Sequence, residues 1–381
     1  FLLPLAMVLG GVAGGVLPGR KYRGPRGVLP SEEQREADRV FCRFLWQFGL
    51  VYAALAFMVM RTVRLVSLSG QRWFLIGAVA VEIIGAALMV IPVERTLHAL
   101  FGEDSIVTEQ APAKINLALL VGEKHPDGYH DVTSVMQSVS LCDTVTARRT
   151  SGDITLTCSD PTLACDETNL AYRAAALFFE ETGVEGGAAL TLEKVIPMQA
   201  GLGGGSSDAA AVLRALRRLY APDMPLEELE RMAIRLGSDV PYCVRGATTL
   251  VEGRGEHLTQ LTALPACWCV LCKPDIACPT GAMYGEIDRR GAHLTLDVQE
   301  MVRALERGDL AAVCALVGNV FEQVIDPESD IFTIRRRLTE LGADAACMSG
   351  SGSAVFGLFT KEETARAAQE LLSQDYPRTF L

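Results

Sequence analysis

The chain lacks the excess of positive charge that nucleic-acid-binding proteins carry. Its 381 residues include 35 Lys and Arg against 46 Asp and Glu, which gives a formal net charge of −11 and a pI near 5.1. This balance argues against nonspecific binding to nucleic acid. The sequence also has no internal repeat and no low-complexity tract, and its length exceeds that of one average domain.

The eleven cysteines do not complete a zinc or disulfide motif. Cys269 and Cys272 form one C-x-x-C, but no second pair or His cluster would complete a tetrahedral site. Together with Cys267 they lie in the apolar run 264–272, which predicts a buried strand where Cys acts as a small hydrophobic residue. We therefore expect reduced thiols and no zinc.

Two common nucleotide-binding motifs are absent. There is no G-x-x-x-x-G-K-[ST], and the glycines do not follow the dinucleotide spacing G-x-G-x-x-G. Instead, the run 197–211 reads PMQAGLGGGSSDAAA, with glycine at four of the five positions 201–205. It leads into an amphipathic helix expected over 209–219, with Ser206, Ser207 and Asp208 as its cap.

This run predicts a phosphate-binding loop. Glycines leave backbone amides uncovered, and the positive end of a helix attracts anions. A flexible Gly-Ser linker is the alternative interpretation, but linkers rarely run straight into a capped amphipathic helix.

A second segment, 111–120, reads APAKINLALL and predicts a strand. Alternation places Lys114, Asn116 and Ala118 on one face, and Ile115, Leu117 and Leu119 on the other. A Lys and an Asn on such a strand indicate either an edge strand with a solvated Lys or a polar cleft.

A third segment, 236–246, reads LGSDVPYCVRG. It follows a helical pattern that begins at Leu226, for which Gly237 is the expected C-terminal cap. Asp239 would then begin a second short helix, with Pro241 in its first turn. By itself this favours an ordinary N-cap aspartate over a functional carboxylate.

Taken together, these segments resemble the GHMP kinase superfamily over roughly residues 107–376. The 197–208 loop is similar to its ATP loop, PAKINL to its first signature and GSDVPY to the motif that holds its acid-base Asp. The segments GYH (128–130), ETNL (167–170), PTGAMY (279–284) and SGSGSA (349–354) match further family positions. The loop is most similar to the branch that acts on a cytidine diphosphate-linked methylerythritol in non-mevalonate isoprenoid synthesis.

The resemblance implies a role for each matched residue. Lys114 and Asp239 would be catalytic, and ATP and Mg²⁺ the cofactors, with Ser206 or Ser207 as a possible metal contact. The implied ATP-binding residues are Pro197, Met198, Gln199, Ala200, Gly201, Leu202, Gly203, Gly204, Gly205, Ser206, Ser207 and Asn169. The implied substrate-binding residues are Asn116, Tyr129, His130, Thr280 and Tyr284. Gln199 departs from the family, which usually has a small residue there.

The resemblance also implies an α+β, two-domain fold. The N-terminal domain, 105–260, would carry the ATP loop, and the C-terminal domain would span 261–381, with the substrate in the cleft between them. Two alternatives remain open: another small-molecule kinase of this superfamily, of homoserine or mevalonate-pathway type, or a membrane protein whose kinase-like part only binds ligand.

Residues 1–104 differ in kind from the rest. The runs 1–18, 44–60 and 73–92 are apolar apart from Glu82, and the last two approach the ~20 residues that cross a bilayer. They predict about three hydrophobic, membrane-spanning helices, although buried helices of a soluble domain are an alternative. The basic stretch 19–43 would lie in the cytoplasm, which puts the kinase there too, anchored to the inner membrane by residues 1–92. Because the chain begins with Phe, we expect a truncated or mis-started product in which a membrane-protein remnant is fused to a kinase.

Overall fold

The computed structural model describes residues 106–126 and 128–381, which fall within one compact unit, 101–381. The predicted membrane helices and the 1–104 segment lie outside these residues. Within 106–126 and 128–381, no helix has both the length and the apolar character needed to cross a bilayer.

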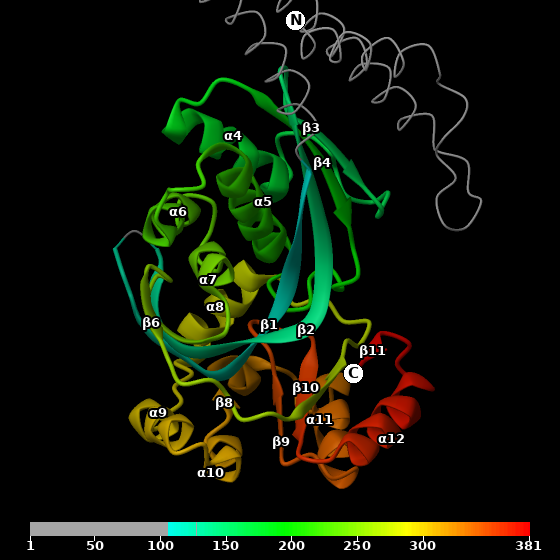
Figure 1. Cartoon of the computed structure of the whole chain (residues 1–381). Coiled ribbons are helices and arrows are strands. Elements are labelled where there is room, and N and C mark those ends of the chain that lie inside the picture. The colour runs from blue at the N-terminus through cyan, green and yellow to red at the C-terminus, as the bar shows by residue number, and fades with distance from the viewer. Residues whose placement is uncertain (1–105, 127) are drawn as a thin grey trace, which may run out of the picture. The chain divides into compact units, whose positions relative to one another are not determined.

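A long hairpin forms the centre of the larger sheet. Its two strands, β1 (Ile106–Lys124) and β2 (His130–Thr150), pair antiparallel along most of their length. Figure 1 shows the hairpin running from the end where β3 and β4 lie to the side where β6 lies. The other strands of this sheet are β3 (Thr155–Cys158), β4 (Gly187–Glu193), β5 (Thr248–Gly253), β6 (His257–Gln260) and β8 (Gly318–Asn319).

Four helices cover the upper part of this sheet (Figure 1). They are α4 (Leu170–Thr182), α5 (Gly204–Tyr220), α6 (Leu226–Ala233) and α7 (Val240–Arg245). Their apolar faces share one buried core with strands β1, β2 and β4, and the middle of α5 supplies Leu213 and Leu216 to it. Packing in this core therefore fixes the position of α5 from Ala209 to Leu219.

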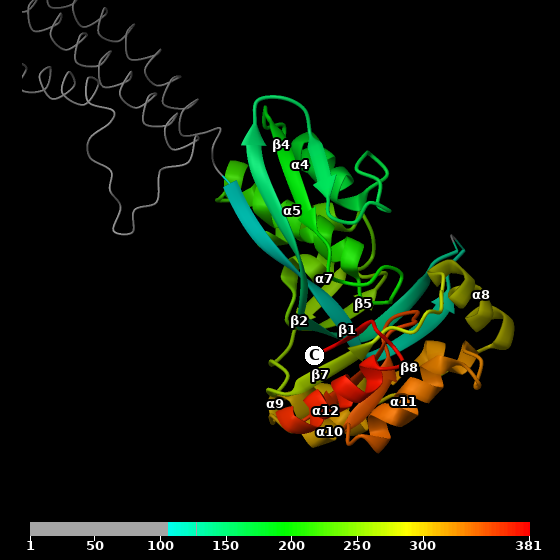
Figure 2. The ribbon, with the colours of Figure 1, turned by 90° about the vertical axis from the view of Figure 1, so that its right-hand side faces the viewer.

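A second, four-stranded sheet forms the lower part of the molecule, as Figure 2 shows. Its order is β11-β7-β10-β9, from β7 (Trp268–Cys272), β9 (Ala345–Met348), β10 (Val355–Phe359) and β11 (Thr379–Phe380). The helical elements of this part are α8 (Thr280–Arg290), α9 (Val298–Glu306), α10 (Leu310–Ala315), the 3₁₀ turn η1 (Val320–Val324), α11 (Asp330–Glu340) and α12 (Glu362–Ser373).

These two parts confirm the predicted α+β architecture. The strand predicted in the apolar run 264–272 is also confirmed, as β7. The short strand β8 comes late in the chain but pairs parallel with β1 of the larger sheet. Residues after 260 therefore form the second sheet and also contribute one strand, β8, to the larger sheet.

Two helix-end predictions are wrong. Helix α5 begins at Gly204, ahead of the predicted Ala209, and its N-cap is Gly203 with no side-chain capping bond. Ser206, Ser207 and Asp208 therefore lie inside the helix. Helix α6 ends at Ala233 with Ile234 as its cap, so Gly237 does not cap it. The chain there tightens into turns in which amides bond carbonyls three residues back, as Leu236 does with Ala233.

Candidate active site

The glycine loop joins β4 to α5. Its backbone packs so closely against neighbouring segments that two of its positions have no room for a side chain. Gly201 has φ +73, and a Cβ there would lie 2.1 Å from the carbonyl oxygen of Ser349. Gly203 has φ +69, and its Cβ would lie 3.0 Å from Lys114 Cγ. Side chains at these two positions would push the loop away from β1 and from the 349–352 turn.

Gln199 adopts a conformation that suits glycine. Its φ is +50, one of two positive values among non-glycine residues in the described chain. A side chain in this left-handed region is strained. The family that the sequence resembles usually has a small residue there, often glycine, which adopts this conformation without strain.

The amino end of α5 is open to an anion. Because no side chain caps it, its first amides are available to an external acceptor. Ser207 is fully buried, and its hydroxyl donates to the carbonyl oxygen of Pro112, 2.8 Å away. Ser206 lines the cavity described below, whereas Ser207 does not.

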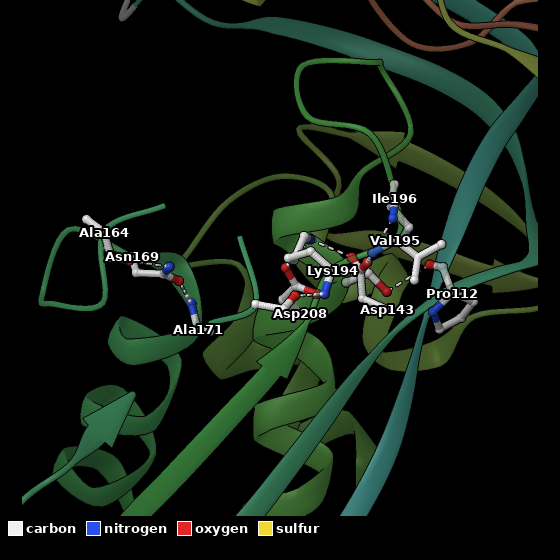
Figure 3. Close-up of polar contacts among 11 residues, drawn as sticks. Pro112, Asp143, Ala164, Asn169, Ala171, Lys194, Val195, Ile196 and Asp208 are labelled. Atoms are coloured by element: carbon white, nitrogen blue, oxygen red, sulfur yellow. Dashed lines mark hydrogen bonds and ion pairs between the residues drawn. The ribbon is translucent and has the colours of Figure 1, made fainter. Parts of the chain in front are cut away.

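A buried ionic cluster of Lys194, Asp143 and Asp208 lies next to the glycine loop (Figure 3). Lys194 Nζ lies 2.5 Å from Asp143 Oδ2 on β2 and 2.6 Å from Asp208 Oδ2 on α5. Asp143 also accepts the amides of Val195 and Ile196 through Oδ1. The cluster therefore ties both ends of the loop to the central sheet.

Two carboxylates share the one ammonium of this cluster, and all three side chains are buried. Burial, together with the negative charge of Asp143, raises the pKa of Asp208 to about 7 against the attraction of Lys194. Asp208 thus titrates near neutral pH.

Strand β1 delivers Lys114 and Asn116 to the same face, as predicted. Lys114 Nζ donates to Asn116 Oδ1 at 2.7 Å, and Asn116 Nδ2 donates to Ser134 Oγ at 2.8 Å. The predicted alternation is wrong further on, because the register slips between Asn116 and Ala118. Ala118 consequently joins the core cluster of Ile115 and Leu117.

Both polar side chains are buried, at 3% exposure for Lys114 and 1% for Asn116. Of the two possibilities that the sequence left open, the structure favours the polar cleft over the solvated edge strand.

Asp239 is the N-cap of α7, with Pro241 in the first turn as predicted, but its side chain makes no capping bond. Instead, Asp239 Oδ2 lies 3.8 Å from Lys114 Nζ. The Asp239 side chain is 36% exposed, whereas that of Lys114 is 4% exposed. The carboxylate is thus held beside an ammonium and faces the cavity.

The 349–352 turn closes onto the same place. Ser349 Oγ donates to the carbonyl oxygen of Gly201 at 2.9 Å, and the amide of Gly350 donates to Asn116 Oδ1 at 2.9 Å. Ser351 lies 3.0 Å, hydroxyl to hydroxyl, from Thr280. The turn therefore joins the loop, β1 and α8.

At the far end of the cavity, aromatic and charged side chains meet. His130 stacks on Tyr284 with ring centroids 5.1 Å apart, and Tyr284 meets Phe321 edge-on at 5.0 Å. Burial, and then the charge of Asp239, raises the pKa of Tyr284 to about 12. Asp288 of α8 bonds His130 Nε2 at 2.7 Å. We call Tyr129, His130, Tyr284 and Asp288 the aromatic end, and residues 197–206 the loop end.

One cavity of about 910 Å³ connects the two ends. Its lining includes Lys114, Asn116, Tyr129, His130, Asp239, Thr280, Tyr284, all of 197–206 and Asp288. Asn169 and Ser207 are the predicted site residues that do not line it. Asn169 caps α4 by accepting the amide of Ala171, and it donates to the carbonyl oxygen of Ala164 (Figure 3).

Asp288 is one of the cavity-lining residues that the sequence interpretation missed, as are Lys124, Arg254 and Ser351. Its signal was the helical spacing, because Thr280, Tyr284 and Asp288 follow each other at intervals of four along α8. Residues at that spacing share one helix face.

Two family models match this chain. The model described as GHMP kinases N terminal domain matches residues 169–247, and that described as GHMP kinases C terminal matches residues 301–378.

Curated relatives extend the similarity to about two thirds of the chain. The 4-diphosphocytidyl-2-C-methyl-D-erythritol kinase of Exiguobacterium sibiricum is 44% identical over 259 residues, which are 68% of this chain and 90% of the relative. The kinase of the same name from Geobacillus kaustophilus is also 44% identical, over 65% of this chain and 87% of the relative.

Solved structures agree with these relatives. A crystal structure of 4-(cytidine 5'-diphospho)-2C-methyl-D-erythritol kinase matches with a TM-score of 0.61 and 36% identity, covering 72% of this chain and 97% of that one. Homoserine kinase from Cytophaga hutchinsonii matches with a TM-score of 0.56 but 20% identity, covering 71% and 90%. This second likeness shows the fold alone.

Proposed function

The chain belongs to the family of 4-diphosphocytidyl-2-C-methyl-D-erythritol kinases, and we propose that it transfers the γ-phosphoryl group of ATP to the 2-hydroxyl of that substrate. The observation that carries the proposal is the Lys114–Asp239 pair, 3.8 Å apart and in the same cavity as an uncapped helix end. Phosphoryl transfer depends on positioning and charge more than on covalent help from the protein.

Each part of the cavity has a task in this reaction. The loop end and the first amides of α5 would hold the ATP phosphates. Asp239 would accept the proton of the attacking hydroxyl as the new P–O bond forms and the bond to ADP breaks. Lys114, which Asn116 orients through its 2.7 Å hydrogen bond, would offset the negative charge that develops on the phosphoryl oxygens.

The residues present also fit Mg²⁺. This ion is usually held by one or two protein oxygen ligands together with substrate phosphates. Ser206 and Asp239 both line the cavity and carry oxygen donors, whereas the Ser207 hydroxyl is committed to Pro112. We therefore favour Ser206 over Ser207 as a contact. Bound Mg²⁺ would supply charge neutralisation between the phosphates.

The base of the substrate would lie at the aromatic end. Tyr129 is 58% exposed and lines the cavity, and the Arg254 guanidinium lies 5.0 Å from the centroid of its ring. The Tyr129 ring would stack on the base. His130, Tyr284 and Thr280 line the same cavity, and the Thr280 hydroxyl lies 3.0 Å from that of Ser351 in the 349–352 turn. Asn169 remains a predicted contact of the ATP base, although its side chain is engaged within its own loop.

The test follows ADP release from the full chain supplied with ATP, Mg²⁺ and 4-diphosphocytidyl-2-C-methyl-D-erythritol. We expect substrate-dependent ADP, and we expect Asp239→Asn to lower kcat at least about 100-fold. The matched control is Asp223→Asn, an exposed loop carboxylate that should leave kcat unchanged. A folded protein that binds ATP but releases no ADP would contradict the proposal and would support a ligand-binding role instead.

We also propose that residues 1–92 anchor the kinase to the inner membrane, with the kinase in the cytoplasm. The support is the length and apolar character of the runs 44–60 and 73–92, together with the basic stretch 19–43. The full chain should remain in the membrane pellet after an alkaline carbonate wash. Recovery in the supernatant would contradict the anchor without affecting the kinase assignment.

A further inference from the structure

Asp288 joins the two ends of the β1–β2 hairpin to α8. Lys124 is the last residue of β1, His130 is the first of β2, and the two are register partners. Lys124 Nζ donates to Asp288 Oδ2 at 2.6 Å, and His130 Nε2 lies 2.7 Å from Asp288 Oδ1. Each carboxylate oxygen therefore engages one side of the turn that carries Tyr129.

The Asp288 carboxylate also dictates the protonation pattern of the His130 ring. Hydrogen bonds from Lys124 and then from His130 hold the pKa of Asp288 below its usual range. An ionised carboxylate only accepts hydrogen bonds, so His130 Nε2 must carry the proton between them. In the neutral ring, Nδ1 is then left as an acceptor.

Packing holds the ring in this orientation. The His130 side chain is 4% exposed and stacks on Tyr284, which itself rests edge-on against Phe321. A ring turned over by 180° would still stack on Tyr284, but it would lose the bond from Nε2 to Asp288.

We propose that Asp288 is a positioning residue that sets the preference of this kinase for a cytosine base over a uracil base. The inference rests on the proposed function. By fixing the proton on Nε2, Asp288 leaves Nδ1 of His130 to accept a hydrogen bond from the 4-amino group of cytosine. Uracil has a carbonyl oxygen at that position, which would place an acceptor against an acceptor.

The substitution Asp288→Asn would move the His130 proton from Nε2 to Nδ1, because Lys124 fixes the orientation of the new amide. The Lys124 ammonium only donates, so it draws the amide oxygen of Asn towards itself. The amide NH₂ then faces His130 Nε2, which must accept, and the ring proton moves to Nδ1. The variant thus presents a donor to the base without a change in side-chain size.

Calorimetric titration of the full chain with CDP and with UDP tests the proposal. The wild type should bind CDP more tightly, and Asp288→Asn should lower the ratio of CDP to UDP affinity by about tenfold or more. The KM for ATP should not change, and kcat should change less than the KM for the cytidine substrate. A merely structural role would weaken CDP and UDP alike.

The matched control is Asp131→Asn. Asp131 bonds His125 Nε2 at 2.9 Å in the same hairpin, but both side chains are exposed and neither lines the cavity. This variant should keep the wild-type ratio.

Equal loss of CDP and UDP affinity in Asp288→Asn, or an unchanged ratio, would overturn the proposal while substrate-dependent ADP release by the wild type still stood. A wild type without that ADP release would instead refute the proposed function. A wild type with no preference for CDP would overturn the Asp288 proposal directly.

Discussion

Backbone forms the loop end of the cavity, whereas side chains from distant segments form its aromatic end. At the loop end, positive φ values at Gly201 and Gly203 and an uncapped helix leave amides open to a ligand. At the aromatic end, the contacts are between side chains: His130 stacks on Tyr284 and bonds the Asp288 carboxylate. Close backbone packing at the loop end leaves little room for larger residues. At the aromatic end, a single substitution can change which groups a side chain offers to a ligand.

The largest expected loss of kcat is at Lys114, which lines the cavity that connects the loop end to the aromatic end. Lys114→Met should lower kcat about 1000-fold, because it removes the ammonium beside Asp239, which in the proposed function would offset charge on the transferred phosphoryl group. Single-turnover measurements of ADP formation check this. Lys361→Met, at the exposed start of α12, serves as the control. A loss below tenfold would mean that Lys114 is a packing residue.

The backbone character of the loop end is tested by a pair of glycines. Gly201→Ala should lower the free energy of unfolding by about 2 kcal/mol, because it combines a positive φ with a Cβ 2.1 Å from the Ser349 oxygen. Gly205→Ala, with nothing within 4 Å of its Cβ, should raise the free energy of unfolding by about 0.5 kcal/mol. Urea denaturation measures both, and equal effects would refute the account of close backbone packing.

The ionic cluster behind the loop predicts a pH dependence. The pKa of Asp208 is about 7 in the folded protein, above the ordinary aspartate value of 3.8, so between these pH values the folded state retains a proton that the unfolded state has lost. The contribution of Asp208 to the free energy of unfolding therefore falls as pH rises towards 7.

Asp208→Asn should remove that dependence. From pH 5 to pH 8, the free energy of unfolding of the wild type should fall relative to that of the variant, by on the order of 1 kcal/mol. Thermal and urea unfolding across this range give the comparison, with Asp223→Asn as an exposed control. Parallel curves for wild type and variant would show that Asp208 does not titrate there.

The smallest expected change is in the free energy of unfolding at Gln199, near the start of the glycine loop. Gln199→Gly should raise the free energy of unfolding by about 0.5 kcal/mol, because relief of a strained φ of +50 slightly exceeds the added flexibility of glycine in the unfolded chain. Urea denaturation measures the change. A destabilised variant would indicate that contacts of the Gln199 side chain outweigh the strain.

The loop end was predictable because its signal is local. Four glycines in five positions, followed by a helical pattern, specify the loop and its helix without reference to the rest of the chain. The capping role assigned to Ser206, Ser207 and Asp208 failed for a tertiary reason. Ser207 is drawn to Pro112 of β1, and Asp208 to Lys194.

The aromatic end was predictable only in part. The Gly-Tyr-His segment and the Pro-Thr segment suggested Tyr129, His130, Thr280 and Tyr284 through family resemblance, while Asp288 carried no motif. Its partners Lys124 and His130 lie more than 150 positions away in the sequence. Only the packing of α8 against the hairpin brings them together.

The sequence by itself thus determined the glycine-rich loop, the strand that carries Lys114 and the helix that begins after Asp239, since each follows from spacing within some twenty residues. The α+β class followed from the family resemblance of the sequence. The tertiary structure decided the 3.8 Å approach of Lys114 to Asp239, the burial of Ser207 and the bonds of Asp288 to the hairpin. The reason is physical: local periodicity fixes which face of an element a side chain occupies, but long-range packing fixes what that face meets.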